Sequence, residues 1–196
     1  MKHNGFEYVD LGLPSGTKWA KYNVGAYSET DNGLYFPFGG IVGLDSPYYE
    51  GNFDPHKLKF NGDIKATLNI DNDAAHIHMG GKWHMPTKEQ FEELLDEKNT
   101  VSTWIYDYCI REVSGRLFRS RINNETLFIP ANGFISNHQY VQNGQTCSLW
   151  TSSIDFSSVY NCTDFFCDKY DTYLARTSAY YICIGIRGVF NTFWIK

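Results

Sequence analysis

Gly80-Gly81-Lys82-Trp83-His84-Met85-Pro86-Thr87 runs directly into Lys88-Glu89-Gln90-Phe91-Glu92-Glu93-Leu94-Leu95, and this stretch decides the fold. Thr87 and Gln90 have the spacing of a capping box, in which the two residues satisfy each other's free backbone N–H groups at a helix start. Phe91, Leu94 and Leu95 recur three and four positions apart, which places them on one helix face. The stretch predicts an amphipathic helix over residues 86–95.

A second, shorter helix is predicted over residues 73–79, with Asp73 as its N-cap and Gly80-Gly81 able to take the left-handed backbone that ends a helix. Elsewhere, short aromatic or β-branched runs lie between Gly, Pro and Asn, which favours short strands and long loops. The clearest strand candidates are residues 127–129, 148–152, 181–184 and 186–190. The sequence predicts an α+β fold with two short helices, antiparallel sheets and long irregular loops.

Length and charge exclude several classes of protein. A chain of 196 residues without repeats or a linker fits a single domain, residues 1–196. Its formal net charge of -5 argues against nucleic acid as the main partner. No apolar run reaches the roughly 18 residues of a membrane helix, and the first residues lack the pattern of a signal peptide. We expect no membrane insertion and no export address.

Metal and nucleophile chemistry find little support in the residue pattern. His76 and His78 point to different faces of the shorter helix, and no zinc-ligand spacing follows them. Residues 69–80 resemble a calcium loop but lack the Gly and Glu that its sixth and twelfth positions need. We therefore expect no catalytic residue, no metal and no cofactor. We also expect most or all cysteines to be free thiols, since their number is odd: Cys109, Cys147, Cys162, Cys167 and Cys183.

The C-terminal tail has an unusual composition. Residues 150–186 contain nine aromatic residues among 37, mixed with Asp, Ser, Thr and Asn, whereas aromatic residues make up 17% of the whole chain. The rings follow neither the period of a strand nor that of a helix, so we expect that not all of them face a core. Exposed Tyr beside small polar residues is typical of a recognition surface, because Tyr gives a large contact area at low entropic cost. Packing beneath long loops is the alternative interpretation.

Several segments, taken in chain order, resemble a known family. They are Tyr8-Val9-Asp10-Leu11-Gly12-Leu13-Pro14-Ser15-Gly16-Thr17-Lys18-Trp19-Ala20, Asn23-Val24-Gly25-Ala26, Gly80-Gly81-Lys82-Trp83-His84-Met85-Pro86-Thr87, Leu127-Phe128-Ile129-Pro130-Ala131-Asn132-Gly133, Leu149-Trp150-Thr151-Ser152-Ser153 and Gly185-Ile186-Arg187-Gly188-Val189. Together they resemble the C-type-lectin-fold domains of gut Bacteroidetes and their phages. The resemblance implies the C-type lectin fold, which hosts sugar binders, protein binders and formylglycine-generating enzymes.

Within that fold, the chain most resembles the variable proteins of diversity-generating retroelements, whose C-terminal stretch is rewritten by adenine-directed mutagenesis and displayed as a binding face. Template Asn codons then become Tyr, Ser, Thr, Asp, Phe, Cys, Ile, Val or Ala, and these residues dominate residues 155–181. The resemblance implies a non-enzymatic protein whose variable region, residues 153–184, binds a protein or glycan receptor. A fixed-sequence surface adhesin or virion binding domain of the same fold is the alternative.

Other branches of the fold fit less well. The Glu-Pro-Asn, Gln-Pro-Asp and Trp-Asn-Asp motifs by which animal lectins hold calcium and sugar are absent from the sequence. The formylglycine-generating oxidases act through a cysteine pair arranged for copper, which only Cys162 with Cys167 or Cys183 could supply, so this activity is a remote alternative. The missing export address favours a phage virion as the location, with a cell surface as the alternative.

Two sets of residues follow from this interpretation. We expect the scaffold to bury one set, which consists of Trp19, Trp83, Phe91, Leu94, Leu95, Trp150 and Ile186. We expect loops and strand ends within residues 153–184 to form the binding face, with Tyr and Phe as anchors and with polar residues fixing orientation. The predicted contact residues are Asp155, Phe156, Tyr160, Asn161, Asp164, Phe166, Asp168, Tyr170, Asp171, Tyr173, Thr177, Ser178, Tyr180 and Tyr181.

Overall fold

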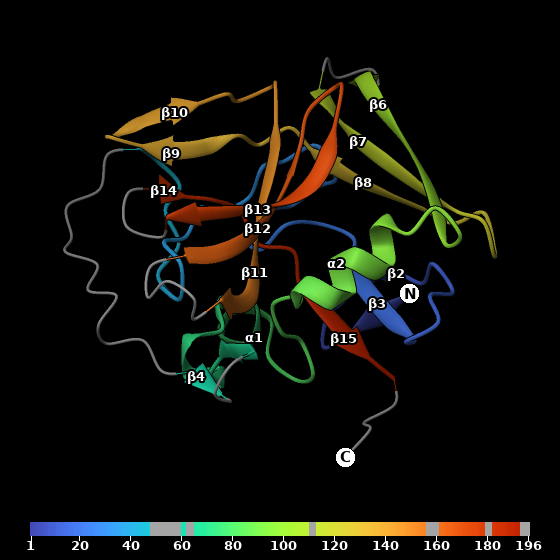
Figure 1. Ribbon diagram of the computed structural model, residues 1–196, viewed down its shortest axis with the longest axis horizontal. Helices are drawn as coiled ribbons and strands as arrows, with labels where there is room; N and C mark the ends of the chain where they lie inside the picture. Colours follow the sequence, from blue (N-terminus) through green and yellow to red (C-terminus); the bar gives the residue numbers. More distant parts are fainter. Residues whose placement is uncertain (48–59, 62–64, 110–112, 156–160, 179–181, 193–196) are drawn as a thin grey trace.

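The computed structural model describes residues 1–47, 60–61, 65–109, 113–155, 161–178 and 182–192 (Figure 1). The helices are a short 3-10 helix at Ile70–Asn72, α1 (Ala74–Met79) and α2 (Lys88–Leu95). The strands are β1 (Lys2–His3), β2 (Phe6–Val9), β3 (Thr17–Ala20), β4 (Phe60–Asn61), β5 (Lys65–Leu68), β6 (Thr100–Tyr108), β7 (Val113–Ser120), β8 (Thr126–Pro130), β9 (Phe134–Ser136), β10 (Gln139–Val141), β11 (Cys147–Asp155), β12 (Asn161–Cys167), β13 (Thr172–Ser178), β14 (Ile182–Cys183) and β15 (Val189–Asn191). The predicted α+β fold with antiparallel sheets is confirmed at this level.

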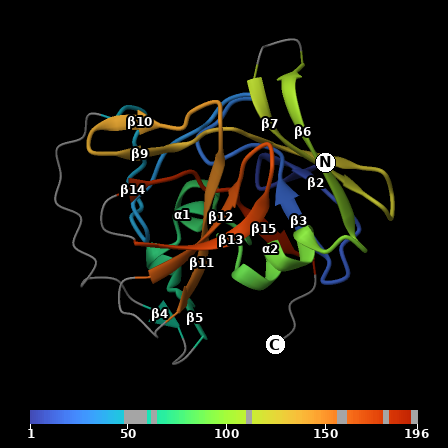
Figure 2. The ribbon, with the colours of Figure 1, turned by 45° about the horizontal axis from the view of Figure 1, so that its top comes forward.

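The described strands form four sheets, and every strand pairing within them is antiparallel. The largest has the order β13-β12-β11-β5-β4, and β6-β7-β8 forms a separate meander beside its β12–β13 end (Figure 2). The other two sheets have the orders β1-β2-β3-β15 and β10-β9-β14. β15 pairs with β3, with Val189 opposite Trp19, so the last described strand closes the sheet that the first strands begin.

Both predicted helices are present, and their caps are the predicted residues. The Asp73 side chain accepts a hydrogen bond from the backbone N–H of His76 at the start of α1, and Gly80 ends that helix with a positive φ of 64°. Thr87 and Gln90 form the predicted capping box at the start of α2. α2 packs against the β11–β13 sheet, where Phe91 stacks on Phe165 with ring centroids 4.9 Å apart.

The capping box leads to a first prediction. Replacing Thr87 with Ala should lower the free energy of unfolding by about 1 kcal/mol, because the N–H of Gln90 loses its acceptor. Thr87→Ser keeps the hydroxyl group and should remain close to the unmodified protein. Urea unfolding followed by circular dichroism measures both variants. An equal loss for the Ser variant would assign the effect to the lost methyl group and contradict the capping role.

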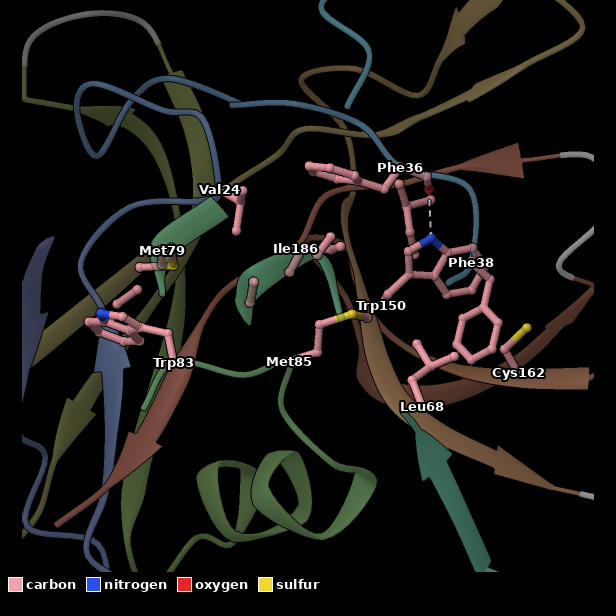
Figure 3. Close-up of a cluster of buried hydrophobic side chains, with 14 of the residues drawn as sticks. Val24, Phe36, Phe38, Leu68, Met79, Trp83, Met85, Trp150, Cys162 and Ile186 are labelled. Atoms are coloured by element: carbon pink, nitrogen blue, oxygen red, sulfur yellow. Dashed lines mark hydrogen bonds between the residues drawn. The ribbon is translucent and has the colours of Figure 1, made fainter. Parts of the chain in front are cut away.

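The core consists of two large clusters of buried side chains. One gathers Trp83, Met85, Trp150 and Ile186 between α1 and the β11–β12 sheet, and the indole Nε1 of Trp150 donates a hydrogen bond to the carbonyl of Phe36 at 2.8 Å (Figure 3). The other cluster joins α2 to the β3, β8, β11 and β12 strands. The predicted core is confirmed for Trp19, Trp83, Phe91, Leu94, Trp150 and Ile186, which are at most 1% exposed, and Leu95 is partly buried against the second cluster.

The predicted strands are confirmed in part. Residues 127–129 and 148–152 lie in β8 and β11, whereas only Ile182–Cys183 of the range 181–184 is a described strand. The range 186–190 is wrong at its start, because β15 begins at Val189. The backbone before β15 bonds to separate segments: the carbonyls of Gly185, Ile186 and Gly188 accept hydrogen bonds from Trp150, Val24 and Ala20. A segment that is divided among three neighbours cannot pair as one strand.

The aromatic tail is more regular than its sequence indicates. Much of it forms the β12–β13 hairpin, although its aromatic residues do not follow the period of a strand in the sequence. The expected alternation is missing because residues 162–165 are all buried, on both faces of β12. A strand buried on both sides carries apolar and small residues at successive positions, which hides the period of two.

Candidate binding face

Three exposed tyrosines gather where the β12–β13 turn meets β6. Tyr106 of β6 is 65% exposed, Tyr170 of the turn is 82% exposed and Tyr173 of β13 is 44% exposed. We call these three residues the tyrosine face. Lys169 connects two of them, since its ammonium lies 4.5 Å from the ring centroid of Tyr170 and interacts electrostatically with Tyr106.

The backbone register explains why Tyr173 points outward. Phe166 and Tyr173 are directly opposite across the β12–β13 ladder, so their side chains lie on the same side of the sheet, with ring centroids 5.2 Å apart. Their neighbours Phe165 and Leu174 occupy the other side and pack into the second core cluster against α2. Burial of one face therefore fixes the exposure of the other.

Hydrogen bonds hold the turn in one conformation. The Asp168 carboxylate accepts from the backbone N–H groups of Tyr170 and Asp171 at 2.7 and 2.8 Å, and the N–H of Asp168 donates to the carbonyl of Asp171 at 3.0 Å. An Asp side chain that accepts from the N–H groups following it replaces part of the hydrogen bonding of a regular turn. Asp168 therefore has a structural role beside the face.

Arg116 of β7 fixes the turn to the neighbouring sheet. Its Nη2 atom donates to the carbonyls of Asp168 and Asp171, at 2.5 and 3.2 Å. The guanidinium is 7% exposed and lies over the ring of Trp104, 5.8 Å from the ring centroid. A buried charged donor thus holds the two ends of the turn and joins the turn to β7.

The electrostatic environment favours the neutral phenol group of Tyr173. Partial burial raises the pKa of Tyr173, and the negative charges of Asp168, Asp171 and Asp164 raise it further. A hydrogen bond with Tyr170 raises the pKa of Lys169, which stays protonated. At neutral pH the face offers apolar rings, O–H donors, one ammonium group and carboxylate acceptors. Such a surface can bind a ligand through stacking and hydrogen bonds.

The structure places the predicted contact residues unevenly. Phe166, Asp168, Tyr170, Asp171 and Tyr173 lie together at the turn end of the hairpin. The prediction of Asp164 as a contact residue is wrong. Asp164 is 4% exposed, since it pairs with Trp150 on one side and with Ala175 on the other and is buried in the sheet. Asp155, Asn161, Thr177 and Ser178 lie at the ends of β11, β12 and β13 that are farthest from this turn. Phe156, Tyr160, Tyr180 and Tyr181 lie outside the described residues.

Two residues at or beside the tyrosine face were missing from the sequence prediction. The first is Tyr106 of the β6–β7 hairpin, a hairpin that composition alone did not reveal. Lys169 is not one of the three tyrosines, but its ammonium lies over the ring of Tyr170, and the sequence prediction did not include it. The signal for β6 is present in the sequence, since Trp104, Tyr106 and Tyr108 recur at every second position.

A cavity of about 370 Å³ beside α1 is the other candidate site, and Asp73, His76 and His84 are among its lining residues. Burial raises the pKa of Asp73, although the N–H groups of His76 and Met85 donate to its carboxylate and the two histidines lie nearby. The Nδ1 atoms of His76 and His84 bond to backbone carbonyls. The carboxylate and both rings thus hold the chain between α1 and α2, which is a structural role.

Within the described ranges, no group of three or more His, Cys, Asp or Glu residues could hold a metal ion. Among the same residues, no helix has the length and apolar character that a membrane crossing requires. Comparisons with protein-family models, with curated proteins and with solved structures found no match to this chain.

Proposed function

We propose that the chain is a non-enzymatic binding domain with a C-type lectin fold, and that it presents the tyrosine face to a protein or glycan receptor. We further propose that it is a variable protein of a diversity-generating retroelement, with its variable region in residues 153–184. The observation that carries the binding role is the exposure of Tyr106, Tyr170 and Tyr173 around a turn that Asp168 and Arg116 hold by hydrogen bonds.

Exposed rings on a fixed backbone suit a binding role. Large aromatic side chains anchor interfaces because they bury much apolar area, and Tyr loses little conformational entropy on binding. Arg116 and Asp168 hold the turn before any ligand arrives, which lowers the ordering cost of association. The acidic groups beside the rings supply acceptors for receptor hydroxyl or amide groups.

The packing of the tail also limits where diversification can occur. Cys162, Phe165 and Cys167 are at most 2% exposed, so exchanging them would disturb the core. The outward positions of the turn and the first part of β13 can accept new side chains at small cost in stability. Tyr170, Asp171 and Tyr173 are all residue types that adenine-directed mutagenesis of an Asn codon produces.

Population sequencing tests the diversification. Many isolates of one population should show substitutions at adenine positions of a nearby template copy, beside a reverse transcriptase gene. Within the described hairpin, we expect changes at Tyr170, Asp171 and Tyr173, and an unchanged Asp168 and Phe165. A uniform tail without a template copy would contradict the retroelement proposal and leave a fixed adhesin or virion domain of the same fold. Changes spread equally over Phe165 and Tyr170 would contradict the assigned face.

The binding role has its own test. The triple variant Tyr106→Ala, Tyr170→Ala and Tyr173→Ala should bind its best receptor from a glycan array and a panel of bacterial surface proteins at least tenfold more weakly, because it lacks its aromatic anchors. Tyr27→Ala is the matched control, since Tyr27 is 93% exposed and lies away from the face. Equal binding by the unmodified protein and the triple variant, with the melting temperature unchanged, would contradict the role of the face.

A further inference from the structure

Two buried cysteines are paired across adjacent strands. Cys147 of β11 is directly opposite Cys167 of β12, and both side chains are 0% exposed. The two thiols are within hydrogen-bonding range of each other, and the Sγ atom of Cys147 donates to the carbonyl of Ile129 at 3.3 Å. All five cysteines are free thiols in the structure, and among the described strand pairings only Cys147 and Cys167 share a register position.

The backbone pattern gives the separation of the two residues. Ser148 uses its N–H and C=O on the side chain of Asn132, both at 2.9 Å, so its backbone faces away from β12. Because successive residues of a strand face opposite ways, the backbone of Cys147 faces β12. A hydrogen-bonded antiparallel pair has Cα atoms about 5.5 Å apart, which lies within the range that a disulfide can bridge.

A buried cation lies beside the two thiols. The guanidinium of Arg116 interacts with both cysteines, and its Nε atom has no hydrogen-bond partner among the described residues. Burial raises the pKa of Cys147 well above its usual value. Burial acts in the same direction on Cys167, but the hydrogen bond with Cys147 and the charge of Arg116 outweigh it and lower the pKa of Cys167.

We propose that Cys147 and Cys167 form a redox modification site, at which hydrogen peroxide converts the cross-strand dithiol into a disulfide. The Cys167 thiolate attacks one peroxide oxygen, the O–O bond breaks, and the proton that Cys167 released converts the leaving hydroxide into water. The sulfur of Cys147 then attacks the resulting sulfenic acid, the S–O bond breaks, and the Cys147 proton leaves with the hydroxyl group as a second water. Two electrons pass from the thiols to the peroxide.

The location gives this modification a structural consequence. Cys167 directly precedes the Asp168–Asp171 turn, and Arg116 contacts both the thiols and the turn carbonyls. A disulfide removes the thiolate as a partner of the guanidinium and covalently joins β11 to β12. The site is independent of the proposed receptor binding, because its chemistry requires neither a receptor nor a variable tail.

Peptide mapping tests the proposal in a Cys109→Ser variant, which removes the exposed thiol. The folded protein is treated with hydrogen peroxide, then unfolded, alkylated and digested. We expect a peptide that links Cys147 to Cys167, while Cys162 and Cys183 remain alkylated as internal controls. The oxidised protein should melt at a higher temperature, and a reductant should reverse the shift. Continued alkylation of Cys147 and Cys167 after the treatment, or oxidation of each to separate sulfinic acids, would overturn the proposal.

Two further single variants assign the roles of the thiols. Cys147→Ser should leave a sulfenic acid on Cys167 that dimedone traps, because its partner can no longer resolve it. Cys167→Ser should give at least tenfold less dimedone adduct on Cys147 than Cys147→Ser gives on Cys167, because the thiol of Cys147 is protonated. Circular dichroism confirms that both variants are folded before the comparison. Equal trapping on the two cysteines would contradict the assignment of Cys167 as the nucleophile.

Discussion

Trp150→Ala should lower the free energy of unfolding by about 3 to 5 kcal/mol. The side chain is 0% exposed, and its ring meets Phe38 edge to face with centroids 5.3 Å apart. The indole N–H also donates to the carbonyl of Phe36, so truncation leaves a cavity and an unpaired buried acceptor together. These two losses affect one cluster, which makes this substitution more costly than most single changes.

Urea unfolding of Trp150→Ala measures the loss, and Tyr170→Ala supplies the contrast. Tyr170 is 82% exposed, so its truncation should change the free energy of unfolding by no more than about 0.5 kcal/mol. A loss of similar size in both variants would mean that the tail contributes to the core, and it would contradict the description of Tyr170 as part of an exposed face.

Arg187→Met should cost at least about 3 kcal/mol of stability. The guanidinium is 0% exposed and donates to the side chain of Asn23 and to the carbonyls of Ala20, Lys21 and Phe128. Burial lowers the pKa of Arg187 to about 10, so the group remains charged at neutral pH. Methionine fills a similar volume but leaves buried acceptors without donors, and each of these costs about 1 to 3 kcal/mol.

Arg119→Met is the matched control for this second substitution. Arg119 lies on β7 and is exposed, so the same chemical change should have little effect there. Thermal unfolding monitored by circular dichroism compares the two variants. If Arg187→Met melts within a few degrees of Arg119→Met, the guanidinium does not join the N-terminal segment to β8, and the core tolerates its removal.

The helix caps and part of the core could be predicted from the sequence, because they depend on local interactions. The Thr87 capping box, the Asp73 cap and the buried tryptophans follow from spacing and apolar character over a few residues, and the structure confirms each of them. The exposed ring of Tyr170 was likewise expected from composition.

Long-range interactions set the limit of the sequence prediction. From its residue type alone Arg187 would be expected at the surface, but the fold buries it among four acceptors. Asp164 was predicted as a contact residue, but it is buried between neighbouring strands. Tyr106 becomes a neighbour of the distant turn only in the folded chain, where Arg116 bonds the turn to β7 and Lys169 interacts with Tyr106. Local patterns in a single sequence do not indicate such partners, since these contacts depend on the register of strands far apart in the chain.

The pairing of β15 with β3 has a consequence for synthesis. A ribosome must make Val189–Asn191 before β3 gains its second neighbour, so the N-terminal sheet stays incomplete until nearly all of the described chain has emerged. Contacts between such distant residues slow folding, because a long loop must close before the contact forms. We expect the N-terminal sheet to form only after Val189–Asn191 has left the ribosome, and a nascent chain stalled before Val189 to remain sensitive to proteases.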